Sequence, residues 1–323
     1  MRALYFDGQQ LTIQHDVADP QPGPGEALLA MRLAGICATD LEILHGYAGF
    51  VGIPGHEGVA TVVACDVRPD LVGRRVVSEI NVSCGQCTMC RTGLPSHCEQ
   101  RAVIGIRRRP GLFAGRVAVP ADLLHVVPDE ISDTQAVFVE PLAAACQVTQ
   151  LVPIGPGDRV VVLGGGRLGL LVAQVLRLTG CELTVLGRRA AALTRAGQQG
   201  LTIGLVGEWP ANERVDVVVE CTGHPTGFDT ALRLVRPRGT VVLKSTYAGP
   251  LTTDISRLVV DEIRLVGSRC GPFPAALRLL RAGLVDPLPL VDATFPLLKG
   301  VEAMAYAAQP GVGKVLLALE DVT

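Results

Sequence analysis

The chain has 323 residues, of which 48% are hydrophobic and 19% charged, with a net charge of -2. This length predicts two domains, because single cores stop growing near about 250 to 300 residues, and the composition is typical of a globular protein. A near-neutral charge argues against a nucleic-acid partner, and the short basic cluster at 107–109 is interpreted as a solvated loop.

No apolar run reaches the roughly 18 to 20 residues of a membrane span, so no membrane partner is expected. Met1 and Arg2 lead directly into strand-like sequence without a signal peptide, and we therefore expect a cytoplasmic location. In that compartment the 10 cysteines are expected to serve as metal ligands and small core residues, not disulfides.

The first part of the chain is rich in short apolar or alternating runs separated by Pro- and Gly-rich turns, which predicts a compact, barrel-like β domain. The expected strands are 3–6, 11–14, 26–33, 58–65 and 74–80. Three residues carry side chains that can bind a metal: Cys37 and His56, between the expected strands, and Glu140, after them. Taken singly, these residues are more commonly a small core cysteine, a loop histidine and a helix-start glutamate.

Four further cysteines lie within fifteen residues, at positions Cys84, Cys87, Cys90 and Cys98. Such short spacings let neighbouring thiolates converge on one ion, and four thiolates complete a tetrahedral zinc shell. An iron–sulfur cluster fits similar spacing, but no second cluster motif flanks the loop. The pattern therefore predicts a structural zinc site.

From residue 128 onward, helical and strand-like segments alternate, which predicts a parallel sheet. Helices are expected at 132–151, 168–178, 227–234 and 298–308, and strands at 159–163, 183–186, 215–220, 240–244, 262–266 and 314–319. Gly164, Gly166 and Gly169 stand in G-x-G-x-x-G spacing between the strand at 159–163 and the following helix. In that context the motif predicts a dinucleotide site, with the pyrophosphate at the helix N-terminus.

Five motifs in order resemble the zinc-containing medium-chain alcohol dehydrogenases: G-I-C-x-T-D, G-H-E, the four-cysteine loop, E-P-L-A and G-x-G-x-x-G. The resemblance covers almost the whole chain and is closest to the polyol, threonine and glucose dehydrogenase branches. It implies an α/β protein with a chaperonin-10-like (GroES-like) β-barrel catalytic domain, residues 1–145 and 271–323, and a Rossmann doubly wound parallel-sheet domain, residues 146–270.

The resemblance also implies a site and a reaction. Cys37 and His56 would be ligands of a catalytic zinc, with Glu140 as the third and Glu57 as its rival. The implied reaction is hydride transfer between an alcohol, secondary and polyol- or sugar-like, and NAD(P). The implied assembly is a homodimer or homotetramer formed through the last strand of the Rossmann sheet.

The route of the alcohol proton is less regular. Thr39 stands two residues after Cys37 and could start a relay, although a threonine in a turn is an equal alternative. Many relatives carry a histidine five residues after the cysteine, where this chain has Glu42. His45 lies nearby at a different spacing, so Glu57, Glu42 and His45 are all retained as catalytic candidates.

The end of the second strand indicates which cofactor is used. An NAD site carries an acidic residue about 20 positions after the glycines, whereas this turn reads Gly187-Arg188-Arg189. Guanidinium groups can hold a 2′-phosphate by charge-assisted hydrogen bonds, so we expect NADP to be preferred over NAD, unless both arginines are solvated. Further contacts to the dinucleotide are expected from Arg167, Leu168 and Thr222.

Two other functional classes fit parts of the sequence. A zinc-free quinone or enone reductase of the same superfamily would bind the same dinucleotide, but it lacks the four-cysteine loop and the ligand trio. A non-catalytic dinucleotide-binding protein is the second alternative. Zinc content and cofactor oxidation with a panel of alcohols would distinguish these classes from an alcohol dehydrogenase.

Overall fold

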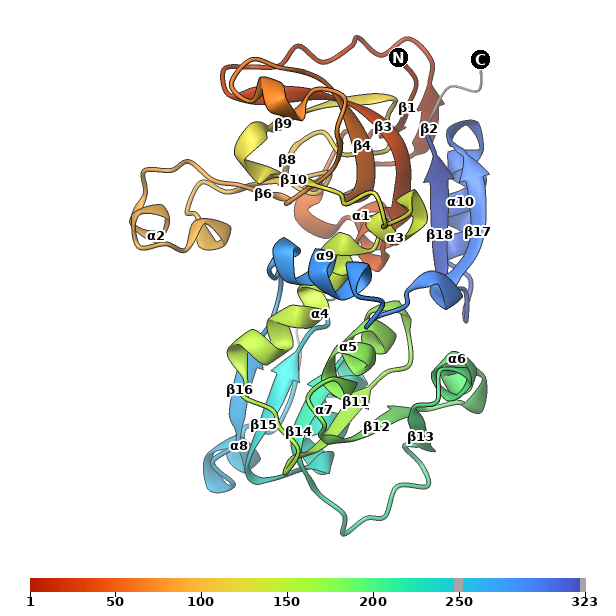
Figure 1. Ribbon diagram of the computed structural model, residues 1–323. Helices are drawn as coiled ribbons and strands as arrows, with labels where there is room; N and C mark the ends of the chain where they lie inside the picture. Colours follow the sequence, from red (N-terminus) through yellow and green to blue (C-terminus); the bar gives the residue numbers. More distant parts are fainter. Residues whose placement is uncertain (247–251, 320–323) are drawn as a thin grey trace. The chain divides into compact units, whose positions relative to one another are not determined.

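The computed structural model describes residues 1–246 and 252–319 of the chain, which forms two compact units (Figure 1). The first unit comprises Met1–Glu140, Ala276–Arg281 and Asp286–Thr323, and the second comprises Pro141–Ala275 and Ala282–Val285. The chain thus leaves the first unit in its middle and returns to it near its C-terminal end.

The first unit is built on a seven-stranded, mostly antiparallel sheet with the order β10-β5-β4-β3-β18-β17, in which β9 also pairs with β3. Its strands are β3 (Glu26–Ile36), β4 (Glu57–Cys65), β5 (Arg75–Ser78), β9 (Arg116–Pro120), β10 (Leu124–Val126), β17 (Val291–Pro296) and β18 (Lys314–Ala318). Along the first part of β3, buried and partly exposed residues alternate, which is the period of a strand with one face in the core. A separate antiparallel hairpin of β1 (Ala3–Phe6) and β2 (Leu11–Gln14) precedes this sheet in the sequence.

Short elements complete the first unit. A three-stranded sheet is formed by β6 (Asn81–Val82), β7 (Ala102–Ile104) and β8 (Arg108–Arg109), and it frames the loop that carries α2 (Thr88–Arg91). The remaining helices are α1 (Ala38–Leu44), α3 (Asp133–Ala136) and α10 (Gly300–Ala307), with α9 (Phe273–Arg281) at the point where the chain returns.

The second unit is a six-stranded, fully parallel sheet with the order β13-β12-β11-β14-β15-β16. Its strands are β11 (Arg159–Leu163), β12 (Glu182–Gly187), β13 (Thr202–Leu205), β14 (Val215–Glu220), β15 (Val235–Leu243) and β16 (Arg264–Gly267), and its helices are α4 (Val139–Leu151), α5 (Arg167–Arg177), α6 (Thr194–Gln198), α7 (Pro225–Leu234) and α8 (Ser256–Val260). Counted within the unit, the order is 3-2-1-4-5-6, which is that of the Rossmann fold. The strand order reverses between β11 and β14, and ligands bind at such a point.

Most predicted elements are present within a few residues of their expected limits, but the helix expected over 132–151 is wrong as one element. It is divided into α3 and α4, because the two residues between them, Val137 and Phe138, are fully buried and turn the chain. Among helices of the described ranges, none has the length and apolar character that crossing a bilayer would require.

Candidate functional site

The loop between β6 and β7 brings four thiols together. The sulfur atoms of Cys84, Cys87, Cys90 and Cys98 all lie within 4.8 Å of one another. The backbone N–H of Cys84 donates to Cys98 Sγ at 3.3 Å, and Cys87 Sγ lies 3.4 Å from Cys90 Sγ. Backbone N–H groups, first that of Cys90, lower the pKa of Cys87 to about 6, whereas burial raises the pKa of Cys90 to about 11. Four converging sulfur donors fit a tetrahedral zinc ion.

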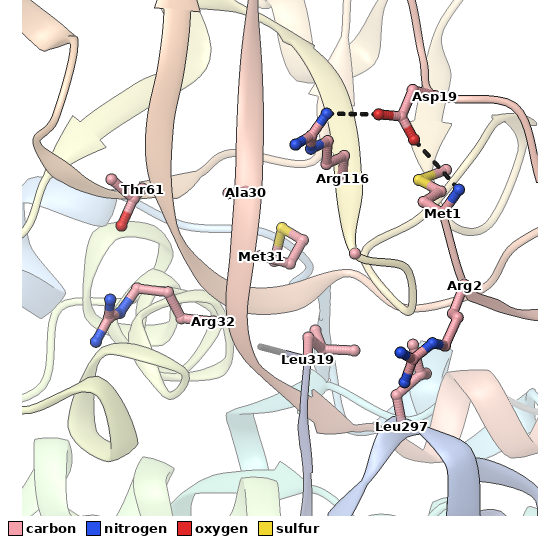
Figure 2. Close-up of a pocket in the computed structure, with 11 residues that line it drawn as sticks. Met1, Arg2, Asp19, Ala30, Met31, Arg32, Thr61, Arg116, Leu297 and Leu319 are labelled. Carbon is pink, nitrogen blue, oxygen red and sulfur yellow. Dashed lines mark hydrogen bonds and ion pairs between the residues drawn. The ribbon is translucent and has the colours of Figure 1, made fainter. Parts of the chain in front are cut away.

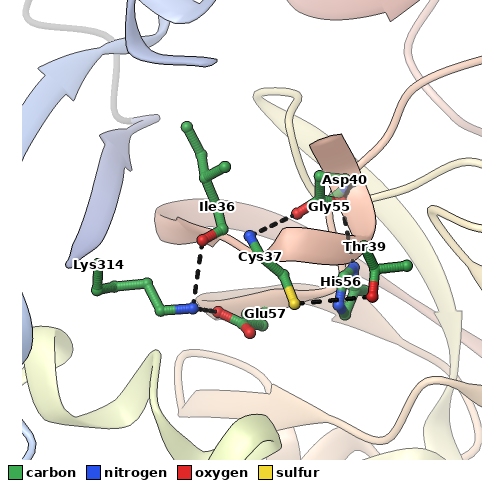
Figure 3. A network of polar contacts seen from close by, with 8 residues as sticks. All are labelled: Ile36, Cys37, Thr39, Asp40, Gly55, His56, Glu57 and Lys314. Atoms are coloured by element: carbon green, nitrogen blue, oxygen red, sulfur yellow. Dashed lines mark hydrogen bonds and ion pairs between the residues drawn. The ribbon is translucent and has the colours of Figure 1, made fainter. Parts of the chain in front are cut away.

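A second cluster forms where β3 ends and β4 begins. Cys37 follows β3 directly, and His56 and Glu57 stand at the start of β4, paired with β3 so that Gly35 faces Glu57. One ligand atom from each of Cys37, His56 and Glu57 lies within 4.8 Å of the other two (Figure 3). His56 and Glu57 are buried and Cys37 is half-buried. One sulfur, one imidazole and one carboxylate are donors that fit a catalytic zinc.

Asp40 holds the residues of this cluster in position, although its sequence motif predicted no role for it. One carboxylate oxygen accepts the backbone N–H of Cys37 at 2.8 Å, while the other accepts the N–H of Gly55 and lies 3.2 Å from His56 Nδ1. Burial lowers the pKa of His56, but the Asp40 carboxylate outweighs this effect and raises it well above its usual value. Because Nδ1 is held by Asp40, Nε2 is the ring atom left to face a metal.

The two carboxylate oxygens of Glu57 have different surroundings. One oxygen accepts a hydrogen bond from Lys314 Nζ, which also donates to the Ile36 carbonyl at 3.3 Å (Figure 3). The other oxygen, Oε1, is buried without a hydrogen-bond partner among the described residues. A Cβ on Gly35 would lie 2.8 Å from Glu57 Oε2, so this close packing requires glycine. An unpaired buried carboxylate oxygen beside Cys37 and His56 is the atom that a metal ion would satisfy.

The other predicted residues of this site lie on helices. Thr39, Glu42 and His45 belong to α1 or its C-terminal cap, and Thr39 Oγ1 lies 3.8 Å from Cys37 Sγ. Thr39 and Glu42 are half-buried, whereas His45 is exposed. Glu140 stands half-buried in the first turn of α4 and, within the described residues, is outside the group of atoms that lie within 4.8 Å of one another.

The glycine motif joins β11 to α5 in the second unit. Gly164 has a φ of +112°, which favours glycine, and a Cβ on Gly169 would lie 1.9 Å from the Gly164 carbonyl oxygen. Nothing lies within 4 Å of a Cβ placed on Gly166, the N-cap of α5, so a ligand can approach the backbone there. These three observations are the three roles expected of a dinucleotide-binding turn.

A cavity of about 190 Å³ opens over this turn. It is lined by Leu163, Gly164, Gly165, Gly166, Leu186, Gly187, Arg188, Arg189, Ala192, Val206, Cys221, Thr222, His224, Thr226, Gly227 and Thr230. The predicted Arg167, Leu168 and Gly169 lie in α5 and are not among the lining residues. Arg188 and Arg189 are exposed at the end of β12, where the chain has no acidic side chain.

A larger cavity of about 490 Å³ lies in the first unit, among β3, the N-terminus and the end of β18 (Figure 2). Arg116 and the N-terminal amine both bind Asp19 there, and Met31, Leu297 and Leu319 supply apolar surface. None of the predicted site residues lines it. The chemistry of the chain is therefore concentrated elsewhere.

Comparison with known proteins agrees with this geometry. The family profile described as alcohol dehydrogenase GroES-like domain matches residues 23–129, and the profile described as zinc-binding dehydrogenase matches residues 168–282. An erythritol/L-threitol dehydrogenase of Mycolicibacterium smegmatis is 32% identical over 94% of each chain.

Two solved structures are similar over nearly the whole chain. One is an alcohol dehydrogenase from Escherichia coli CFT073 complexed with NADH, with a TM-score of 0.89, 28% identity, and coverage of 98% of this chain and 99% of the other. The second is a zinc-binding dehydrogenase from Sinorhizobium meliloti 1021 bound to NADP, with a TM-score of 0.87, 28% identity and coverage of 98% of each chain.

Proposed function

Because the chain belongs to the zinc-containing medium-chain alcohol dehydrogenases and is an NAD(P)-dependent oxidoreductase of alcohols, we propose that its substrate is a secondary, polyol-like alcohol. The similarity to an erythritol/L-threitol dehydrogenase supports this substrate class. The observation that carries the chemistry is the buried cluster of Cys37, His56 and Glu57 around one point. Neither the zinc-free reductase nor the non-catalytic alternative accounts for that cluster.

We propose that Cys37 and His56 hold the catalytic zinc and that the third ligand is Glu57 or Glu140. The unpaired Oε1 atom of Glu57 supports the first assignment, and the E-P-L-A motif that begins with Glu140 at the start of α4 supports the second. When bound, zinc would supply Lewis acidity that lowers the pKa of a coordinated alcohol. The thiolates of Cys84, Cys87, Cys90 and Cys98 would hold the structural zinc.

For the proton, we propose that Thr39 accepts it first, since its hydroxyl is 3.8 Å from Cys37 Sγ. Glu42 lies three residues further along α1, and residues at this spacing share one helix face. This makes Glu42 the preferred next acceptor, while exposed His45 is the remaining candidate.

The experiment that tests the function is a panel of C4 to C6 polyols, sugars and simple secondary alcohols, assayed with both nicotinamide cofactors. We expect the largest kcat/KM with a polyol, and loss of activity in Cys37→Ala. Purified, zinc-loaded protein that oxidises none of these alcohols would contradict the proposal.

We propose that NADP is preferred. The exposed guanidinium groups of Arg188 and Arg189 beside the dinucleotide cavity support this choice, as does the absence of an acidic side chain in that turn. Replacing Arg188 by Ala should lower kcat/KM for NADP by about tenfold to a hundredfold and leave that for NAD nearly unchanged, because a phosphate–guanidinium hydrogen bond is lost. Arg177→Ala, an exposed arginine outside the cavity, is the control, and an unchanged cofactor ratio in Arg188→Ala would rule out this role.

We further propose domains at 1–145 with 271–323 and at 146–270, assembled as a homodimer or homotetramer in the cytoplasm. The two units change over near these limits, at Glu140 and Ala275. Ten free cysteines suit a reducing compartment.

Strand β16 is an edge of its sheet, and Val259, Val260 and Leu265 on or beside it are 72%, 79% and 41% exposed. An apolar sheet edge of this kind is covered when two copies pair.

A further inference from the structure

The cavity of about 490 Å³ over β3 in the first unit has the size of a small-molecule site, since such pockets enclose about 300 to 1,000 Å³ (Figure 2). Ala30 on β3 stands in the middle of its lining, paired with Thr61 on β4 at one side and with Arg116 on β9 at the other. Side chains of residues paired in this way share one face of the sheet. The small methyl group of Ala30 leaves space between its larger neighbours.

The rim of this cavity carries arginine side chains from three segments of the chain. Arg32 stands two residues after Ala30, and residues at this spacing point to the same face of a strand. Arg116 approaches from β9, and Arg2 precedes β1 (Figure 2). Guanidinium groups from separate segments therefore surround one hollow, and each can hold a carboxylate or a phosphate by paired hydrogen bonds.

The nearby carboxylates fix these arginines without cancelling their charge. Asp19 is the acidic residue among the described residues that line the cavity, and it binds both Arg116 and the N-terminal amine. Asp133, which pairs with Arg32, is shared with Arg75. Each carboxylate thus serves two cations, and an excess of positive charge remains. Side chains held in this way lose less freedom when a ligand binds.

The remaining lining is apolar, which bears on the kind of anion that fits. Met31, Leu297 and Leu319 supply this surface. A bare inorganic ion would leave that surface without a partner, whereas a carbon skeleton would cover it. Cys37, His56 and Glu57 are not among the described residues that line the cavity, so its ligand is not the reacting alcohol.

We propose that this cavity binds a small organic anion that carries two or more carboxylate or phosphate groups on a short carbon skeleton. The site is separate from the candidate metal site and from the dinucleotide turn, and this inference goes beyond the proposed function. The oxyanion groups would contact the arginines, and the skeleton would lie over Ala30 against the apolar residues. Carboxylates and phosphates share this chemistry, and the choice of probes distinguishes them.

The test measures binding to the whole enzyme by calorimetry at about 0.15 M salt, where nonspecific attraction between exposed charges is screened. The probes are succinate, 2-phosphoglycolate, the neutral analogue succinamide, and inorganic sulfate. Arg116→Gln removes a rim charge, and Ala30→Leu fills the hollow without changing any charge. Arg68→Gln is the matched control, because Arg68 is 50% exposed and pairs with an aspartate, as Arg116 does at 47% exposure. Arg188→Ala tests for binding at the dinucleotide turn instead.

We expect wild-type enzyme to bind one molecule of succinate or 2-phosphoglycolate per chain, whichever of the two binds more tightly identifying the preferred oxyanion group. Arg116→Gln and Ala30→Leu should each weaken this binding by about tenfold, while Arg68→Gln and Arg188→Ala leave it as in the wild type. Succinamide should not bind, and sulfate should bind more weakly than either organic anion.

Three results would overturn the proposal. One is the lack of saturable binding of both organic anions up to about 10 mM. Another is binding that Arg116→Gln and Ala30→Leu both leave unchanged. The third is sulfate binding as tight as that of the organic anions, which would show attraction of bare anions only. Alcohol oxidation by the wild-type enzyme is assayed in parallel, so that failure of this site is distinguished from failure of the proposed function.

Discussion

At the scale of single residues, the carboxylate of Asp40 makes three contacts at the candidate metal site. It accepts the N–H groups of Cys37 and Gly55 and holds His56 Nδ1, so it fixes both the position of the sulfur and the orientation of the ring. Partners of this kind typically change metal affinity by about 10- to 100-fold when removed. We predict that Asp40→Asn weakens binding of the catalytic zinc by a factor in this range, measured by competition with a chelator.

The matched control is Asp70→Asn, because Asp70 is an exposed aspartate that pairs with Arg68 in the connection between β4 and β5. It should leave both zinc sites as they are. Wild-type zinc retention in Asp40→Asn would show that the carboxylate does not position the ligands.

Residue identities at the site could be predicted only in part. The four loop cysteines were predicted from their spacing, and Cys37 and His56 from the resemblance of their motifs to the family. Asp40 was missed, although its place three residues after Cys37, at N3 of α1, is the spacing of a capping box. Lys314 could not have been found, because its contact with Glu57 depends on the pairing of β18 with β3 across more than 250 residues of sequence.

At the scale of elements, strands with buried β-branched runs, such as β11 and β14, were predicted with their limits correct. The single helix expected over 132–151 was wrong, although Pro141 marks the first turn of a separate helix, where proline is favoured. Strand β17 was missed because its alternating half-buried residues include a proline and an aspartate. Local patterns thus define long elements and fail where tertiary burial decides the boundary.

The short helix α3 provides an element-scale prediction through Asp133. Its carboxylate binds Arg32 on β3 at 2.6 Å and Arg75 on β5 at 2.7 Å. Burial raises the pKa of Asp133, but hydrogen bonds from Arg75 and Arg32 outweigh this and lower it below 3.8. The ionised form is therefore favoured by folding, and its contribution is fully present above pH 3.8 and is lost as the pH falls through the lower folded value.

We predict that Asp133→Asn lowers the free energy of unfolding by about 1–2 kcal/mol near pH 7, a value reduced for partial solvent exposure. The difference from wild type should shrink below about pH 4. Urea unfolding of both proteins at each pH checks this, since loss of zinc in acid affects both alike. A difference that stays constant down to pH 3 would contradict it.

At the scale of the whole molecule, the return of the chain to the first unit places β18 beside β3, the strand that ends at Ile36 just before Cys37. Lys314, near the end of the sequence, therefore contacts Glu57 of the candidate metal site near its start. Assembly is the other property at this scale, and we predict dimers or tetramers through β16. Replacing Leu265 and Val260 together by charged residues should convert the oligomer to monomers in light scattering. A wild-type protein that is itself a monomer would contradict this prediction.

The central claim is that one chain holds two zinc ions with separate roles, and metal analysis of matched variants tests it most directly. Wild-type protein should contain two zinc ions per chain. Cys37→Ala should retain one, stay folded and lose alcohol oxidation, whereas Cys84→Ser should lose the other together with stability, because a structural zinc contributes folding free energy. Wild-type protein that binds one zinc or none when purified without chelators, or Cys37→Ala that still oxidises alcohols, would contradict the account.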